Sequence, residues 1–150
     1  MKKETVLTVL KDIRTLLKGT IKPVPVLAPG DTRFTKLSDG WVKDGQLGID
    51  WGQTYTEKMT WKEALDRCKK DGFRLPTPEE MSTLINRSKY NPAIVDGAEI
   101  LDMKTDDWYW TLTPCAWDSG SAWYVGFGYG SVYYVYEGGS NYVRPVRSSQ

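Results

Sequence analysis

The side chains best able to do chemistry are few in this sequence, and their spacing argues against catalysis. The 150 residues include no histidine and only two cysteines, Cys68 and Cys115. Without histidine, Ser-His-Asp triads, histidine acid–base catalysis and HExxH zinc sites are excluded. Two thiols far apart in sequence and outside any CxxC motif build neither a disulfide framework nor a zinc site unaided. We therefore expect two free thiols.

Acidic residues occur in two clusters that could in principle bind calcium. Glu99 lies near Asp102, and Asp106 is next to Asp107. Neither cluster has the alternating oxygen ligands of a calcium-binding loop, so the favoured interpretation is solvated loop carboxylates. We expect no metal ion and no cofactor.

The segment RLPTPEE also carries charged residues, among them Arg74 and Glu80. Glu80 stands three residues after Thr77, which is the spacing of a helix capping box. Arg74 can bridge a loop carboxylate or carbonyl, and Arg144 and Arg147 are likewise interpreted as parts of the scaffold. These residues predict structure and not catalysis.

The most unusual composition lies in residues 128–142, GYGSVYYVYEGGSNY. This stretch has no Lys or Arg and a single acid, in a chain that is 13% aromatic overall. Tyr, Ser, Gly and Asn are also the residues that antibody loops use, because tyrosine gives a large contact area at low entropic cost. An ordinary Tyr-rich hairpin and a ligand-contact surface are the two interpretations.

The N-terminal part of the chain is expected to be an appendage to one domain. Apolar residues with helical spacing predict an amphipathic helix within residues 1–20, which Gly19 ends. Residues 21–32 form a Pro-rich connector. The helix either packs on its own domain or forms a homo-oligomer, and the sequence leaves both open.

From residue 33 onward the pattern predicts an α+β domain. Two Asp-Gly pairs, at residues 39–40 and 44–45, indicate hairpin turns. Thr60 and Thr77 each cap a helix, the second running through RLPTPEEMSTLINRSK. Strands follow in the last third, and YVRPVR is an edge strand or a strand end because it contains Pro145. The two ends of the domain are expected to pair.

Net charge and hydropathy limit the kinds of partner that we expect. With a net charge of +1, the chain lacks the excess of positive charge typical of proteins that bind nucleic acid or an anionic membrane. The N-terminus lacks a signal peptide, and no stretch is long and apolar enough to span a bilayer. A cytoplasmic or virion-associated location is expected.

Six motifs then point to a known family. GIDW, MTWKEALDRC, FRLPTPEEM, YWTLTP, AWYVGFGYGSV and YVRPVR stand in the order typical of a bacterial domain found at the C-terminus of collagen-like adhesins. Across residues 33–147 the chain resembles this family, which implies a C-type lectin-like fold for residues 33–150, with two helices and a small antiparallel sheet. The fold is related to the formylglycine-generating enzyme, whose cysteine pair lies in the C-terminal part. Cys115 is alone there, so we expect no enzyme.

A subset of the family resembles the variable proteins of diversity-generating retroelements. In those systems, miscopied adenines rewrite the 3′ end of the gene and give the protein a new ligand specificity. Rewriting Asn codons yields most residue types but never Trp, Met, Lys, Gln or Glu. Trp117, Trp123 and Glu137 therefore cannot arise from a rewritten Asn codon, whereas the other non-motif residues between positions 109 and 147 can. The alternative is a fixed-specificity adhesin module that binds glycans.

The resemblance implies a set of variable, ligand-binding positions in the last third of the chain, for an unknown protein or glycan. They are Leu112, Cys115, Ala116, Asp118, Ser119, Ser121, Gly126, Gly128, Tyr129, Ser131, Tyr133, Tyr134, Tyr136, Gly138 and Ser140.

Strand alternation adds a prediction about which way side chains in this region point. If Trp123, Val125 and Phe127 face the core, Gly126 and Tyr133 face away from it. We accordingly expect Tyr129, Tyr133 and at least one of Tyr134 and Tyr136 to expose their rings on one continuous face beside the 112–121 loop.

Overall fold

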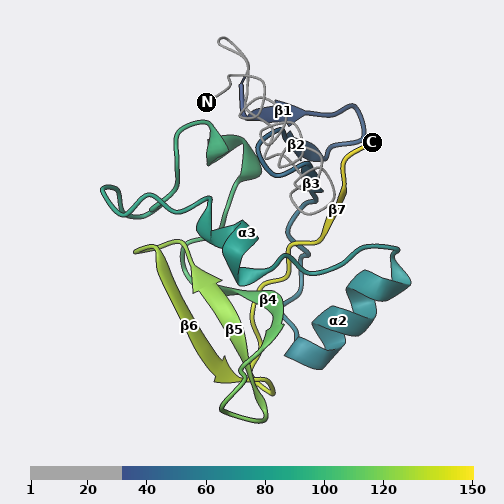
Figure 1. Cartoon of the computed structure of the whole chain (residues 1–150), viewed down its shortest axis with the longest axis vertical. Coiled ribbons are helices and arrows are strands. Elements are labelled where there is room, and N and C mark those ends of the chain that lie inside the picture. Colours follow the sequence, from purple (N-terminus) through teal and green to yellow (C-terminus); the bar gives the residue numbers. More distant parts are fainter. Residues whose placement is uncertain (1–31) are drawn as a thin grey trace, which may run out of the picture.

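Two antiparallel sheets and two helices make up residues 32–150, the part of the chain that the computed structural model describes (Figure 1). The chain is thus a mixed α+β domain, as its sequence predicts. The predicted N-terminal helix and nearly all of the connector lie outside the described residues.

The first sheet joins the two ends of the domain. Its order is β1 (Phe34–Lys36), β2 (Val42–Asp44), β3 (Ile49–Trp51) and β7 (Val146–Ser148). Both predicted hairpin turns connect its first three strands. β7 pairs with β3, with Trp51 opposite Val146, so the expected pairing of the two ends is confirmed. Pro145 directly precedes β7, which is an edge strand.

Buried Asp44 holds the first sheet together. Its carboxylate accepts two hydrogen bonds from Arg33, at 2.8 and 3.0 Å, and one from the indole N–H of Trp51 at 3.1 Å. It also accepts the backbone N–H groups of Gln46 and Leu47 and so shapes the second turn. Asp44 is fully buried, so these hydrogen bonds must replace the hydration that its carboxylate has lost.

Arg144 and Arg147 serve the scaffold, as predicted. Arg147 bonds Asp50 at 2.9 Å and Asp39 at 2.7 Å, which ties β7 to β3 and to the first turn. Arg144 is buried and donates to the backbone carbonyl of Leu101.

Helix α2 (Trp61–Lys70) begins at the predicted capping box, in which Thr60 and Glu63 bond each other's backbone N–H. Its inner side buries Ala64 and Cys68. Burial raises the pKa of the Cys68 thiol to about 11, so the group stays protonated near neutral pH. Both Cys68 and Cys115 are free and buried.

Helix α3 (Pro78–Ser82) has its predicted capping box but is much shorter than expected. The chain leaves the helix because residues 84–86 pair with residues 93–95 instead. Val95 N–H donates to Leu84 and Asn86 N–H to Ala93, and Ile85 and Ile94 form an isolated bridge. Tertiary pairing therefore overrides the helical tendency of this stretch. A short 3-10 helix, η1 (Ala98–Leu101), follows.

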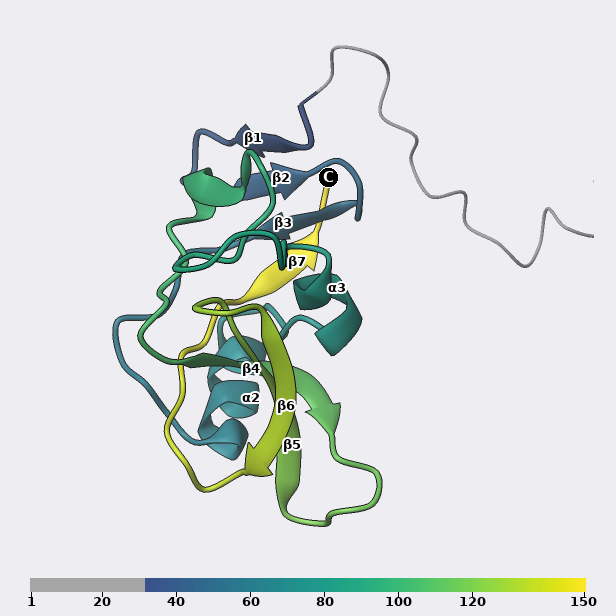
Figure 2. The ribbon, with the colours of Figure 1, turned by 90° about the vertical axis from the view of Figure 1, so that its left-hand side faces the viewer.

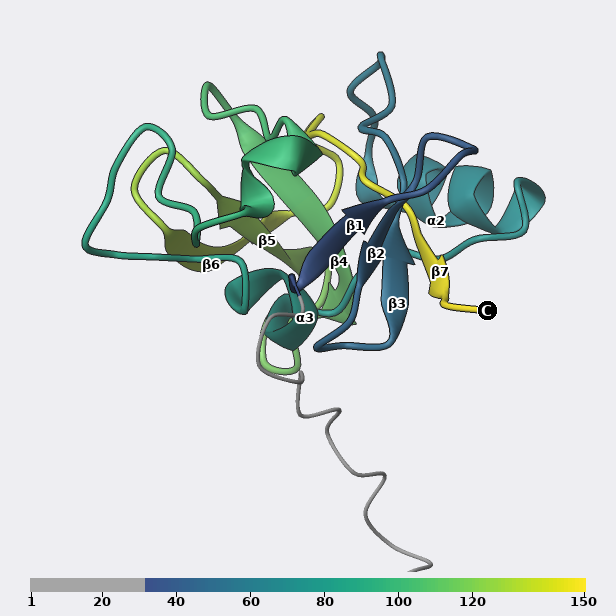
Figure 3. The same cartoon turned by 90° about the horizontal axis from the view of Figure 1, so that it is seen from above.

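The second sheet is an antiparallel meander, in the order β4 (Trp108–Pro114), β5 (Ser121–Gly126) and β6 (Ser131–Tyr136). Seen from above, the first sheet and α2 lie to one side and the β5–β6 hairpin to the other (Figure 3). Within residues 32–150, no helix has the length and apolar character needed to cross a membrane.

We predict that Asp44→Ala lowers the free energy of unfolding by about 3–5 kcal/mol, because it leaves Arg33 and the Trp51 indole without their acceptor. Asp66→Ala is the control, since Asp66 pairs with Lys62 on an exposed helix surface and its loss costs less than about 0.5 kcal/mol. Urea denaturation measures both. Equal losses would contradict the role given to Asp44.

Candidate binding surface

The second sheet is packed on both faces. Toward α3, Tyr109 and Val125 join a core with Met81 and Leu84. On the opposite face, Trp110 and Ala122 pack with Ala64 and Cys68 of α2. The second face is therefore not free along its whole width: Gly126 is buried there, against the prediction, whereas Tyr133 is exposed as predicted. What remains open is the outer edge of β6 and the two ends of the hairpin.

Large aromatic rings are exposed along this edge. Tyr129 is 80% exposed, Tyr133 59% and Tyr136 69%, and Trp117 in the preceding loop is 67% exposed. The expected exposure of Tyr129, Tyr133 and Tyr136 is thus confirmed. Several exposed aromatic rings along one strand are unusual for the surface of a monomer and are typical of an interaction site.

Four of the rings near the edge touch each other. Trp117, Trp123 and Tyr134 meet edge to face, with centroids 5.6–5.7 Å apart. Tyr133 stacks on Tyr134 at 5.1 Å, although the two are neighbours in the strand. We call these four residues the aromatic cluster. It joins the 112–121 loop to β6, as expected.

Tyr129 lies apart from this cluster. It occupies the β5–β6 turn, whereas the 115–120 loop lies at the opposite end of the hairpin (Figure 2). The exposed tyrosines therefore follow the length and edge of β6 and do not share one flat face, which corrects that part of the prediction.

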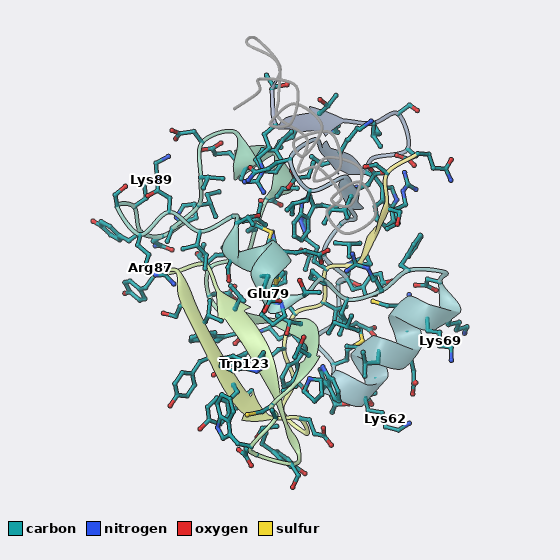
Figure 4. The ribbon with its side chains drawn as sticks, in the orientation of Figure 1. Lys62, Lys69, Glu79, Arg87, Lys89 and Trp123 are labelled. Carbon is teal, nitrogen blue, oxygen red and sulfur yellow. The ribbon has the colours of Figure 1, made fainter. Side chains whose placement is uncertain are left out.

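A groove of about 530 Å³ runs between α3 and the strands. Pro78, Ser82, Thr113, Trp123 and Val132 line it, with exposed Glu79 at its rim. Figure 4 shows Glu79 on α3 and Trp123 on β5 close to each other. Trp123 is half-buried, so its assignment to the core is wrong, whereas Trp51 and Trp110 are fully buried.

Most of the predicted ligand-binding positions reach solvent. The exposed ones are Leu112, Ala116, Asp118, Ser119, Tyr129, Tyr133, Tyr136, Gly138 and Ser140, and the half-buried ones are Gly128, Ser131 and Tyr134.

Three predicted positions, Cys115, Ser121 and Gly126, are buried and do not present a surface to a ligand. A methyl group added at Gly126 would lie 3.0 Å from the ring of Trp108, which covers this glycine. Ser121 donates its hydroxyl to Asp118, and its carbonyl accepts the Cys115 N–H. All three serve local packing.

The groove and the cluster include residues that sequence reasoning missed. Trp117 lies outside the predicted positions because rewritten Asn codons never yield Trp, and the capping box of α3 predicts a helix start and no binding role. A tryptophan in a polar loop was the available signal, since burying it there is difficult. For the groove-lining residues of α3 the sequence held no such signal.

The surface is poor in positive charge. Residues 109–143 contain no Lys or Arg, and Asp118 and Glu137 are their only acids. Desolvation raises the pKa of Tyr124, so its phenol stays neutral. The ring of Tyr124 stacks on that of Trp108, with centroids 4.2 Å apart. In residues 32–150 no three metal-ligating side chains gather at one place. The surface can offer aromatic contact and hydrogen bonds, with little charge.

Arg74 and Glu80, which could suggest catalysis, form a two-bond ion pair at 2.7 and 2.8 Å. Glu80 also bonds the N–H of Thr77 within the capping box. This pair fixes the start of α3, which positions one wall of the groove.

A rigid α+β scaffold with an aromatic surface on one sheet edge defines a small ligand-binding domain. The family model described as the Lcl C-terminal domain matches residues 40–147. The chain belongs to this family, which the resemblance of its six motifs had indicated. Among curated proteins, no sequence matches it.

We predict that Gly126→Ala lowers the free energy of unfolding by about 1–3 kcal/mol, because the new methyl group presses on the Trp108 ring. Gly139→Ala is the matched control, since its methyl group meets only ordinary contacts and its effect stays within about 0.5 kcal/mol. Thermal unfolding of both variants is the measurement. A stable Gly126→Ala variant would restore this position to the variable surface.

Proposed function

We propose that residues 33–150 form a C-type lectin-like module that binds a ligand through the β6 edge, the aromatic cluster and the adjoining groove. The observation that carries the proposal is the exposure of Trp117, Tyr133 and Tyr136 beside a groove, on a sheet that has a hydrophobic core against each of its faces. Tyrosine and tryptophan give much contact area for little lost freedom. The module has no catalytic role in this proposal.

We further propose that a retroelement diversifies this surface. In support, twelve of the fifteen Asn-reachable positions named above are exposed or half-buried. Changes at such positions usually alter stability by less than about 0.5 kcal/mol, so the scaffold tolerates rewriting. The positions that pack Trp108 and the loop, namely Gly126, Cys115 and Ser121, would stay constant or vary only among small residues.

The diversification is tested in DNA. Sequencing the neighbourhood of the gene should reveal a near-copy of its 3′ end that differs only at adenines, close to a reverse-transcriptase gene. The differing codons should fall on the exposed and half-buried positions. A neighbourhood without such a copy would leave a binding module of fixed specificity, the glycan-binding adhesin being one form.

We predict that replacing Tyr129, Tyr133 and Tyr136 together by Ser leaves the fold intact. The three rings are mostly in solvent, so the expected loss is no more than about 0.5 kcal/mol for each. Trp110→Ala, which empties a fully buried site, should cost about 3–5 kcal/mol. Denaturant unfolding compares them, and similar losses would mean that scaffold and binding surface are not separate.

A further inference from the structure

The four sheet edges of the described chain differ in how they are closed. Next to β4, Trp110 and Tyr142 each donate an N–H across the edge, to Tyr142 and Trp108 respectively. Beside β7, Arg74 and Val146 exchange both of their backbone hydrogen bonds. β1 is only three residues long and carries exposed Lys36. β6 has six residues, and its only strand partner in residues 32–150 is β5.

The register shows which backbone groups of β6 point outward. Glu137 N–H donates to Gly120 across the end of the β5–β6 ladder. Hydrogen-bonded pairs alternate in an antiparallel ladder, so residues 131, 133 and 135 bond β5 while residues 132, 134 and 136 point away. The other side of β5 agrees, because the carbonyls of Ser121 and Trp123 accept bonds from β4 and the loop after it.

Five backbone groups are left open on the outer edge. They are the N–H and C=O of Val132, the N–H and C=O of Tyr134, and the N–H of Tyr136, none of which bonds another group within residues 32–150. The carbonyl of Tyr136 already accepts Gly139 N–H. Viewed from the side of β6, no described segment covers this edge (Figure 2).

Free edges are normally blunted by lysine, proline or a bulge, because they otherwise pair with other chains. The sequence of β6, SVYYVY, has neither a proline nor a charged residue. Its pairing with β5 runs without a register shift from Ser131 to Tyr136. The edge is thus both open and unprotected, at the strand that carries Tyr133 and Tyr136.

We propose that the ligand is a polypeptide that adds an extended segment to β6 as a fourth strand. This inference rests on the proposed function and names its ligand class. Open groups on alternate residues repeat every ~6.6–6.8 Å, a spacing that another extended backbone matches. In such strand addition the main chain supplies affinity and alternate side chains supply specificity. Backbone contacts would also persist when the side chains of the surface change.

The surroundings define the side chains of that segment. The groove beside Val132 and Trp123 is lined by apolar side chains and the hydroxyl residues Ser82 and Thr113. Glu79 is its one charged residue and has no ion-pair partner among residues 32–150. A matching segment places apolar or aromatic residues beside β6 and a Lys or Arg near Glu79. A second copy of β6 offers no cation there, because the strand is uncharged. The edge therefore fits a target polypeptide better than it fits itself.

The test uses the full chain and peptides selected against it from a displayed library of random ten-residue sequences. Each amide N–H of a selected peptide is then methylated in turn, which leaves the protein unchanged. We expect affinity to fall by about tenfold or more at alternate positions and by less than about threefold between them, because only every second N–H faces β6.

Four results separate the alternatives. Methylation without this alternation, or a selection that yields no peptide, overturns strand addition. If a selected peptide shows no alternation but binds the Tyr133→Ala variant more weakly than the wild type, the aromatic surface remains the binding site and the proposed function survives. If neither N-methylation of the peptide nor Tyr133→Ala changes the affinity, both strand addition and binding at the aromatic surface are rejected. Sedimentation of the unliganded chain as a dimer that selected peptides dissociate would assign the edge to a second copy and overturn the proposal.

Discussion

Everything in the second sheet depends on the packing of both of its faces. Tyr109 and Trp110 are adjacent in β4, point to opposite faces and are both fully buried, one against the α3 core and one against the α2 core. Packing on both faces covers β4 and much of β5, and leaves side chains of β6 half-buried or exposed. The remaining surface of the sheet consists of the edge of β6, the hairpin ends and the groove beside α3.

That constraint separates the scaffold from the surface that can vary. The scaffold is held by buried groups whose loss is costly, such as Asp44 under Arg33 and Trp51. The aromatic cluster lies at the margin of this scaffold, where its exposed and half-buried rings meet one another. Side chains along the edge can therefore change with little effect on folding, while the open backbone groups of β6 remain.

Local signals in the sequence predicted local structure well. Thr60 and Thr77 cap helices as expected, and both Asp-Gly pairs lie at hairpin turns. The α+β class and the pairing of the ends followed from the order of elements. The length of α3 could not be predicted, because pairing of residues 84–86 with residues 93–95 decides it.

The site was predicted in composition but not in geometry. Alternation within one strand shows that Trp123 and Tyr124 point apart, but it does not reveal that both faces are covered. Gly126 was therefore assigned to the surface, although the Trp108 ring covers it. The buried pair Tyr109 and Trp110 was the one hint, since two large neighbouring aromatic residues in a strand need two cores.

Amide hydrogen exchange in the unliganded protein shows whether the β6 edge is open, because it reports on the backbone of β6 residue by residue. We expect fast exchange for Val132, Tyr134 and Tyr136, whose N–H groups have no partner among residues 32–150, and slow exchange for Tyr133 and Val135, which bond β5. Uniform protection along β6 would show that the edge is already occupied, and uniformly fast exchange would show that the strand is not held in the sheet.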